Sequence, residues 1–125
     1  MKRKILNILS IITGLLFING GLAKIFKYIP APPDLPQELV NDNLALEEIV
    51  WLLPLIAIAE IVGGALLILR KTRALGVLIL FPVMVGVLLV HLFVDLSGLP
   101  IALIIWAILI WIIIDNLERY KPLIK

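Results

Sequence analysis

The sequence predicts an all-α integral membrane protein: one domain, residues 1–125, folded as a four-helix transmembrane bundle. Hydrophobic residues make up 62% of the 125, and the mean hydropathy is +1.16. A soluble domain is about 45–50% apolar, so this chain carries more apolar surface than a water-soluble core can bury. Four apolar segments are long enough to cross a bilayer, and the basic residues form three clusters beside them.

A transmembrane helix needs about 20 mostly apolar residues. Four segments meet this requirement, and they cover residues 5–26, 49–69, 74–94 and 99–118. The apolar core of the fourth ends at Ile114, and we expect Asp115 and Glu118 at the membrane interface. The longest connector joins the first two spans, over residues 28–48.

The charges of the connectors predict which way the helices point. Basic residues cluster before the first span, between the second and third, and after the fourth: Lys2, Arg3, Lys4, Arg70, Lys71, Arg73, Arg119, Lys121 and Lys125. Short loops rich in Lys and Arg stay in the cytoplasm. We therefore predict both termini on the cytoplasmic side of the cytoplasmic (inner) membrane of a bacterium, with the long connector outside.

The first 23 residues also admit a second interpretation, as a signal peptide. They have a basic start, and Gly21-Leu22-Ala23 resembles a small-residue cleavage site. The apolar run is longer than the about 7–15 residues usual for such a peptide. We therefore favour a retained span.

The composition excludes several classes of chemistry. The chain has no cysteine and one histidine, so it can form neither disulfides nor thiolate metal sites, and one chain cannot ligate haem with two histidines. Its basic residues lie at helix ends, which indicates membrane orientation and not nucleic-acid binding. We expect no metal and no intrinsic cofactor, and contact with the lipid bilayer and with a protein partner or a second copy of the chain.

The long connector begins with prolines that favour an extended backbone: Pro30, Pro32, Pro33 and Pro36. Asp34 is placed to cap a short helix over Pro36–Val40. We interpret the segment as a surface connector, with a lid over an outward-facing cavity as the alternative. Pro54 and Pro82 each remove a backbone donor inside a span and are expected to bend it.

Small residues predict where the helices touch. In lipid, close helix packing depends on Gly, Ala and Ser, and on hydrogen bonds between helices. The first span offers the pair Gly20-Gly21, and the second offers Gly63-Gly64. We expect these four glycines at helix–helix contacts.

Glu60 is the most informative polar residue. It lies roughly 16 Å along the second span, near the bilayer centre. A carboxyl group there costs at least about 2.5–3.5 kcal/mol to insert, so it should face the bundle interior and have a partner. Asn19, at a similar depth on the first span, is the predicted partner. The alternative is a purely structural, protonated Glu60 that donates one hydrogen bond.

A second group of polar residues lies nearer the outer side. Lys24 and His91 are each about one turn from the outer ends of their helices, and Asp95 is placed to hydrogen-bond the imidazole. Direct contact between Lys24 and Glu60 is not expected, because their backbones differ by about 12 Å in depth. We predict Glu60 and His91 as catalytic residues and Asn19, Lys24 and Asp95 as ligand-binding residues. The alternatives are a Lys24 that reaches the headgroups and a packing role for His91.

Two segments resemble the DoxX-like family of small four-span membrane proteins, which includes DoxD and MauE types. They are Gly14-Leu-Leu-Phe-Ile-Asn-Gly-Gly-Leu-Ala-Lys24 and Ala59-Glu-Ile-Val-Gly-Gly-Ala-Leu-Leu-Ile-Leu-Arg70. The third span, which ends near His91, is also similar. Relatives include a subunit of thiosulfate:quinone oxidoreductase and membrane partners of oxidative-stress enzymes.

The resemblance implies a membrane subunit associated with redox chemistry. Such a subunit would bind a quinone or another lipophilic molecule in the outer half of the bundle, as an accessory to a quinone-linked oxidoreductase. Two alternatives remain open. One is a non-enzymatic assembly factor or chaperone, and the other is a protomer of a small-molecule transporter.

Overall fold

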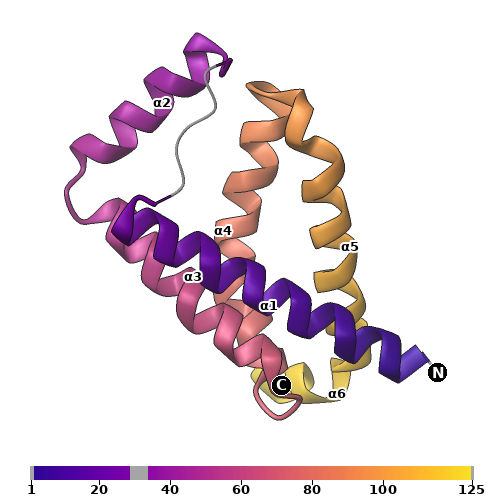
Figure 1. The fold of residues 1–125 in the computed structure, drawn as a ribbon. Coiled ribbons are helices and arrows are strands. Elements are labelled where there is room, and N and C mark those ends of the chain that lie inside the picture. Colours follow the sequence, from indigo (N-terminus) through magenta and orange to yellow (C-terminus); the bar gives the residue numbers. More distant parts are fainter. Residues whose placement is uncertain (1, 29–33, 125) are drawn as a thin grey trace.

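The computed structural model describes residues 2–28 and 34–124, and within them every regular element is helical. The predicted all-α class is therefore confirmed. The elements are α1 (Lys2–Phe26), α2 (Gln37–Glu48), α3 (Leu52–Ile68), α4 (Arg73–Phe93), η1 (Leu96–Gly98), α5 (Leu99–Asp115), α6 (Leu117–Tyr120) and η2 (Lys121–Leu123). Figure 1 shows their arrangement.

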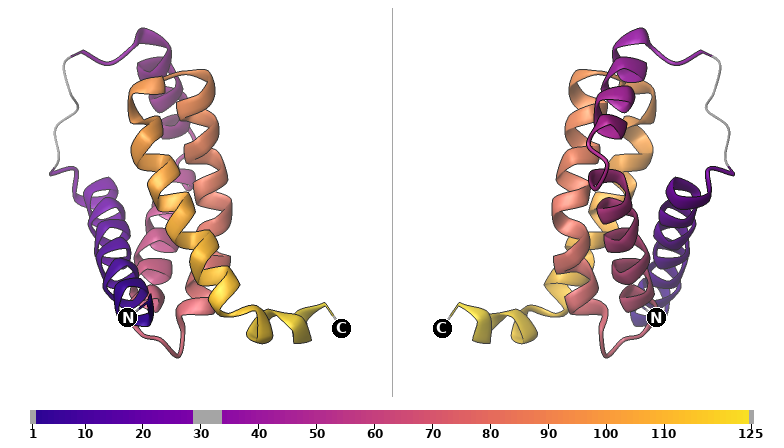
Figure 2. Two further views of the ribbon diagram at one scale, coloured as in Figure 1. Left: turned by 90° about the vertical axis from the view of Figure 1, so that its right-hand side faces the viewer. Right: turned by 90° about the vertical axis from the view of Figure 1, so that its left-hand side faces the viewer.

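The four long helices pack in the order α1, α3, α4, α5. Helix α1 lies along α3, α3 packs on α4, α4 packs on α5, and α1 touches α5 less extensively. Both termini lie at one end of the bundle together with the turn between α3 and α4 (Figures 1 and 2). Helix α2 and the turn between α4 and α5 lie at the opposite end. The three basic clusters therefore lie at the same end.

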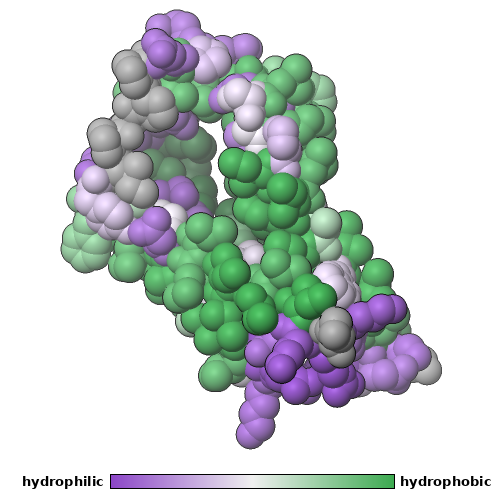
Figure 3. Space-filling view, turned by 45° about the vertical axis from the view of Figure 1, so that its right-hand side comes forward, coloured by the Kyte–Doolittle hydropathy of each residue, from purple (hydrophilic) through white to green (hydrophobic). Residues whose placement is uncertain are grey.

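Three helices are long and apolar enough to cross a membrane: Lys2–Phe26, Arg73–Phe93 and Leu96–Asp115. A fourth crossing is obtained if α2 and α3, which meet at a 95° bend, are counted as one broken span. Hydrophobic side chains cover the middle of the molecule, and hydrophilic ones gather at its two ends (Figure 3). This distribution matches a bilayer's apolar centre and polar surfaces.

The second predicted span, 49–69, begins later than expected. Residues 49–51 form a turn, and α3 starts at Leu52. Pro54 lies in the first turn of α3, where a missing N–H costs no helical hydrogen bond, so it is not expected to bend the helix. Helix α4 continues through Pro82.

The connector between the first two predicted spans also differs from the prediction. Its helix is α2, Gln37–Glu48, with Pro36 at the N-cap and no side-chain cap, so Asp34 does not serve that role. No residue of α2 is buried, which fits a surface connector better than a closed lid. The predictions for Pro30, Pro32, Pro33 and Lys125 lie outside the described residues.

The fourth predicted span, 99–118, is interrupted. Helix α5 ends at Asp115, and the Asn116 side chain donates to the carbonyl of Ile112 over 2.8 Å. This bond satisfies one of the last carbonyls of α5, which have no helical partner. The short helix α6 then turns away from the bundle (Figure 2).

The hydrophobic core lies in the half of the bundle that carries the termini. Its fully buried side chains come from α3, α4 and α5: Leu67, Val77, Leu80, Leu109 and Ile112. Helix α1 adds Leu6 and Phe17. The opposite half is hollowed beside α4 and α5 (Figure 3). The helices therefore converge at one end and separate toward the other.

Glycines bring α1 and α3 into backbone contact. A Cβ atom on Gly14 would lie 2.5 Å from the carbonyl oxygen of Gly64, and a Cβ on Gly64 would lie 2.5 Å from that of Gly14. A Cβ on Gly21 would lie 2.6 Å from the carbonyl oxygen of Ala57. Only glycine allows this approach, and it fixes the antiparallel register of the two helices.

Gly63 faces the opposite neighbour, α4. A Cβ on Gly63 would lie 2.6 Å from the Leu80 side chain, and a Cβ on Gly76 would lie 2.8 Å from the carbonyl oxygen of Gly63. The adjacent pair Gly63-Gly64 therefore lets α3 pack closely on α4 with one residue and on α1 with the next.

Candidate functional site

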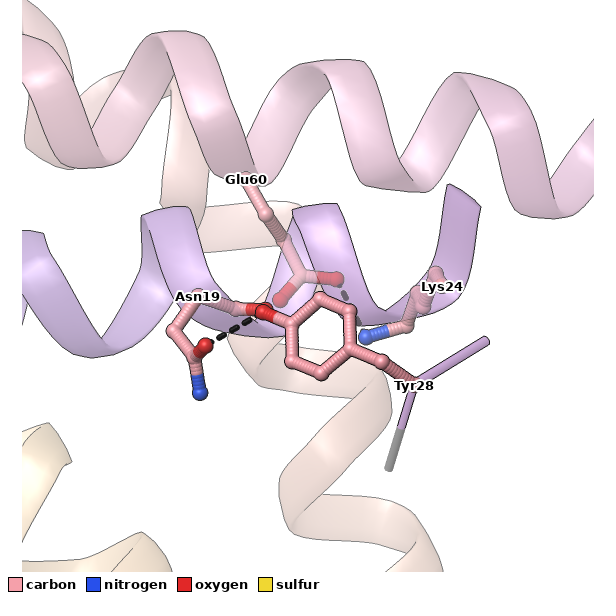
Figure 4. A network of polar contacts seen from close by, with 4 residues as sticks. All are labelled: Asn19, Lys24, Tyr28 and Glu60. Atoms are coloured by element: carbon pink, nitrogen blue, oxygen red, sulfur yellow. Dashed lines mark hydrogen bonds and ion pairs between the residues drawn. The ribbon is translucent and has the colours of Figure 1, made fainter. Parts of the chain in front are cut away.

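Glu60 projects from α3 toward α1 and is 6% exposed. Its position follows from the register above, because Gly64 lies one turn farther along the same face of α3. Figure 4 shows the carboxyl group beside α1, with Asn19, Lys24 and Tyr28 around it. A carboxyl buried among apolar helices requires a compensating partner.

Lys24 is that partner. Its Nζ lies 2.6 Å from Oε1 of Glu60, so the expectation that these residues do not meet is wrong. Side chains on a helix tilt toward its N-terminus. Helices α1 and α3 are antiparallel, so Lys24 tilts along α1 in one direction and Glu60 tilts along α3 in the other. The two tilts converge, and they close the distance that separates the backbones.

Gly20 leaves the space into which the carboxyl group fits. It precedes Lys24 by one helical turn, and a Cβ on Gly20 would lie 3.0 Å from Oε2 of Glu60. Any larger residue would press on this oxygen. Gly20 is therefore placed to shape the site, whereas Gly21, the next residue, contacts the α3 backbone.

The ion pair connects a buried group to a more accessible one. The Glu60 side chain is 7% exposed and the Lys24 side chain 37%. Oε1 is buried, and the ammonium is close to it without the alignment of a directed hydrogen bond. The attraction is therefore mainly between charges, and the ammonium keeps hydrogens for other acceptors.

Asn19 pairs with Tyr28 and not with Glu60. The hydroxyl of Tyr28 donates to the side-chain oxygen of Asn19 and, over 3.0 Å, to its carbonyl oxygen. Lys27 makes this return possible. Its φ of 53° places it in the left-handed region, and its N–H donates to the Ala23 carbonyl over 2.7 Å. This left-handed ending turns the chain back toward α1.

A cavity of about 480 Å³ borders Lys24 where the C-terminal end of α1 lies beside the junction of α2 and α3. Its walls are mostly apolar, and its charged lining residues are Lys24, Lys27 and Glu47. The apolar lining comes from Ile25, Ile49, Val50, Leu53, Pro54 and Ile58. Ligand sites commonly have about 300–1,000 Å³ and a few polar groups in an apolar wall, and this cavity has both features.

His91 and Asp95 form a separate structure at the C-terminal end of α4. The imidazole Nδ1 lies 3.0 Å from the backbone oxygen of Asp95, not from its carboxylate. The ring also packs on Gly98, where a Cβ would lie 2.2 Å from it. In the described residues no hydrogen bond or ion pair joins His91 to Glu60 or Lys24. The C-terminal end of α4 lies apart from that of α1 (Figure 2).

The Asp95 carboxylate has its own role. It accepts hydrogen bonds from the Ser97 hydroxyl (2.6 Å) and the Ser97 N–H (3.1 Å), and so caps η1. These two bonds lower the pKa of Asp95 below its ordinary value. Among the described residues no group of three His, Asp or Glu side chains is placed to hold a metal ion.

The comparison with protein families gives a match to the DoxX family model over residues 5–92. This is more than half of the 125-residue chain. The chain belongs to the DoxX family. No curated protein and no solved structure gives a significant match.

DoxX proteins are membrane proteins that are often linked to redox functions, and this member is accordingly a multi-pass membrane protein. The matched region contains α2, α3 and nearly all of α1 and α4. It thus includes both residues of the ion pair and the glycines that bring them together.

Sequence reasoning on this DoxX chain missed three contributors to the site. Tyr28 was assigned no role in the site, although its hydroxyl reaches back to Asn19. Lys27 had no assigned role, because a lysine gives no sequence signal for left-handed backbone. Glu47, at the end of α2, enters the cavity wall only because the chain bends between α2 and α3.

Proposed function

We propose that this DoxX protein binds a quinone, or a similar lipophilic carbonyl compound, in the cavity beside Lys24, as the membrane subunit of a redox system. The observation that supports the proposal best is the meeting of a mostly apolar cavity with one end of a buried ion pair. An apolar wall accommodates the ring and tail of such a compound. The ammonium is the hydrogen-bond donor that its carbonyl oxygen requires.

Lys24 would hold the ligand, and Glu60, whose carboxylate lies 2.6 Å from the ammonium, would hold Lys24 in position beside the cavity. Lys27, which also lines the cavity, is a second donor at its rim. His91 lies outside this arrangement. We therefore assign it no role in the site, and Lys24 would contact the ligand beside Glu60.

Reduction of a quinone to a quinol takes two electrons and two protons. We assign the electrons to a partner protein, because this chain has no cysteine for a cluster or dithiol centre. The ammonium of Lys24 would supply one proton to the carbonyl oxygen that it contacts, and water entering through the open side of the cavity would supply the second proton and reprotonate Lys24. The protein would then be an accessory subunit, and the partner would carry out the electron transfer.

We further propose how the protein is oriented in the cytoplasmic membrane of a bacterium. Helices α1, α4 and α5 would each cross the bilayer, and α3 with the turn before it would form the fourth crossing. The end with both termini and the basic clusters would face the cytoplasm. The cavity beside Lys24 would then open near the outer surface.

The test is equilibrium binding of a short-tailed benzoquinone to the purified protein in detergent micelles. We expect Lys24→Met to weaken binding by at least about tenfold, since a hydrogen bond from a charged donor contributes about 1.5–3 kcal/mol. Glu60→Gln should weaken it less. The controls are Lys4→Met, at the opposite end of α1, and His91→Ala, and both should bind as the wild type does. Unchanged affinity in Lys24→Met would refute the proposed site.

One observation favours an assembly factor as the second candidate. Gly86 on α4 has nothing within 4 Å of where its Cβ would lie, so it offers a place where another helix can approach closely. A stable client that co-purifies with the wild type and is lost in Gly86→Leu, with no quinone binding, would support this function.

A further inference from the structure

A second cavity, of about 240 Å³, lies at the end of the bundle that carries the termini. Its lining residues are Arg3, Arg70, Arg73, Asp115, Asn116, Glu118 and Arg119. Four guanidinium groups against two carboxylates leave the lining with a net charge of +2. Among the described residues none of these arginines has a carboxylate oxygen within 4.0 Å. The cavity is therefore basic, and its arginines are not neutralised by ion pairs.

Arg73 is held rigidly in the wall. It is 4% exposed, and its Nε donates to the carbonyl of Leu67 over 2.8 Å. Its Nη2 donates to the Asn7 side chain (2.9 Å) and to the carbonyl of Ile68 (3.2 Å). The last carbonyls of α3 thus fix the guanidinium. Nη1 makes no hydrogen bond with any described residue and keeps its hydrogens for a ligand.

The other three arginines differ in how firmly they are held. Nη1 of Arg119 donates to the carbonyls of Lys71 (2.8 Å) and Arg70 (3.3 Å), which ties α6 to the α3–α4 turn. The side chains of Arg3 and Arg70 are exposed and make no hydrogen bond within the described part of the chain. The wall therefore combines two fixed guanidiniums with two that are free to close on a ligand.

Two helix N-termini add positive potential at the same place. Arg3 lies in the first turn of α1, and Arg73 is the first residue of α4. Neither first turn contains an acidic residue, and Thr72 at the N-cap of α4 makes no side-chain cap. The Thr72 hydroxyl donates to the Leu66 carbonyl at the end of α3. Helix N-termini without such compensation attract anions.

We infer that this cavity binds a phosphate diester whose head group carries hydroxyls, supplied by an anionic phospholipid such as phosphatidylglycerol. Guanidinium forks match phosphate oxygens in two-point hydrogen bonds. Asp115 and Glu118 then accept hydrogen bonds from the head-group hydroxyls. Because the cavity lies where α1 and α4 begin, it is level with lipid head groups, and basic pockets between helices bind such groups there.

The full chain, purified in a nonionic detergent, is given equal amounts of phosphatidylglycerol and phosphatidylcholine, and bound lipid is counted by native mass spectrometry. We expect retention of phosphatidylglycerol. Arg3→Gln and Arg70→Gln should each weaken it about fivefold. The matched controls, Lys4→Gln and Lys71→Gln, remove the same charge from neighbours that do not line the cavity, and they should weaken it less than about twofold.

Competition identifies the source of the phosphate. Glycerol phosphate or inorganic phosphate that displaces the lipid at low millimolar concentration would indicate a soluble phosphate ligand, and failure to displace it would indicate the lipid. Equal losses in the lysine and arginine variants would overturn the inference, because they would mean general surface attraction. No preference for phosphatidylglycerol would do the same. The thermal unfolding transition of each variant with phosphatidylcholine alone, compared with that of the wild type, checks that the substitution leaves the fold intact.

Discussion

Lys24 and Glu60 meet across the α1–α3 interface, with Nζ 2.6 Å from Oε1. The backbone of Lys24 nevertheless lies six residues along α1 from the residue directly opposite Glu60. Gly14 against Gly64 and Gly21 against Ala57 define that register. The two side chains bridge the offset because antiparallel helices tilt them toward each other. The contact thus depends on the direction of α1 relative to α3 as well as on the identity of the two residues.

The first prediction concerns the stability of this pair. Lys24→Met should destabilise the protein by about 1–3 kcal/mol, because it leaves a buried carboxyl without its cation. Glu60→Gln in the Lys24→Met background should recover part of that loss, since the uncompensated charge is gone. Unfolding in mixed detergent micelles measures all four members of the cycle. Strictly additive single effects would show that the two groups do not interact.

The second prediction compares two glycines. Gly64→Ala should destabilise the protein by about 1–3 kcal/mol, because its Cβ would lie 2.5 Å from the Gly14 carbonyl oxygen and force α1 and α3 apart. Gly86→Ala is the matched control. It meets nothing within 4 Å and should stabilise α4 by up to about 1 kcal/mol. Equal effects of the two substitutions would be inconsistent with backbone contact at Gly64.

The third prediction concerns the left-handed residue that ends α1. Lys27 has φ of 53°, a conformation that costs a residue with a Cβ atom roughly 1 kcal/mol and glycine almost nothing. Lys27→Gly should therefore be more stable than Lys27→Ala by about that amount. Both variants lose the same charge, so the difference between their thermal stabilities reports the cost of the left-handed backbone at residue 27. A less stable Lys27→Gly would argue against the left-handed ending.

The fourth prediction concerns pH. The Ser97 hydroxyl and N–H hold the pKa of Asp95 below its ordinary 3.8. A carboxylate with a lowered folded-state pKa stabilises the fold above its unfolded pKa, and that contribution is lost as the pH falls through the folded-state value. Ser97→Ala removes the shorter of the two bonds and should raise the pKa of Asp95. A carbon NMR titration of the Asp95 carboxyl in wild type and variant measures this change in pKa. An unchanged pKa would contradict the hydrogen bond from Ser97 to Asp95.

Much of the fold could be predicted from the sequence, because the length of an apolar segment is a local property. The helix expected over 5–26 is α1, which begins three residues earlier, and that expected over 74–94 is α4, which lies one residue earlier. The differences arise where capping decides the boundary. Pro54 lies in the first turn of α3, and the Asn116 side chain caps the end of α5. Neither effect shows in hydropathy.

The site was less predictable. Burial of Glu60 against α1 follows from the cost of a carboxyl group in lipid. The identity of its partner, Lys24, does not follow from the sequence, because depth measured along the helix axes neglects the tilt of the side chains. Tyr28 reaches Asn19 only through the left-handed Lys27, which no local pattern indicates. His91 was expected beside Lys24 because both lie near outer helix ends, but those ends separate.

The paired glycine contacts determine which parts of the protein are able to move. The contacts of Gly14 and Gly21 on α3 are two turns apart on both helices, so a slide of one residue would break both at once. Helices α1 and α3 therefore behave as one rigid unit that includes Lys24 and Glu60. If the half of the bundle opposite the termini widens, we expect this helix pair to rotate as a unit relative to α4 and α5, about the hydrophobic core.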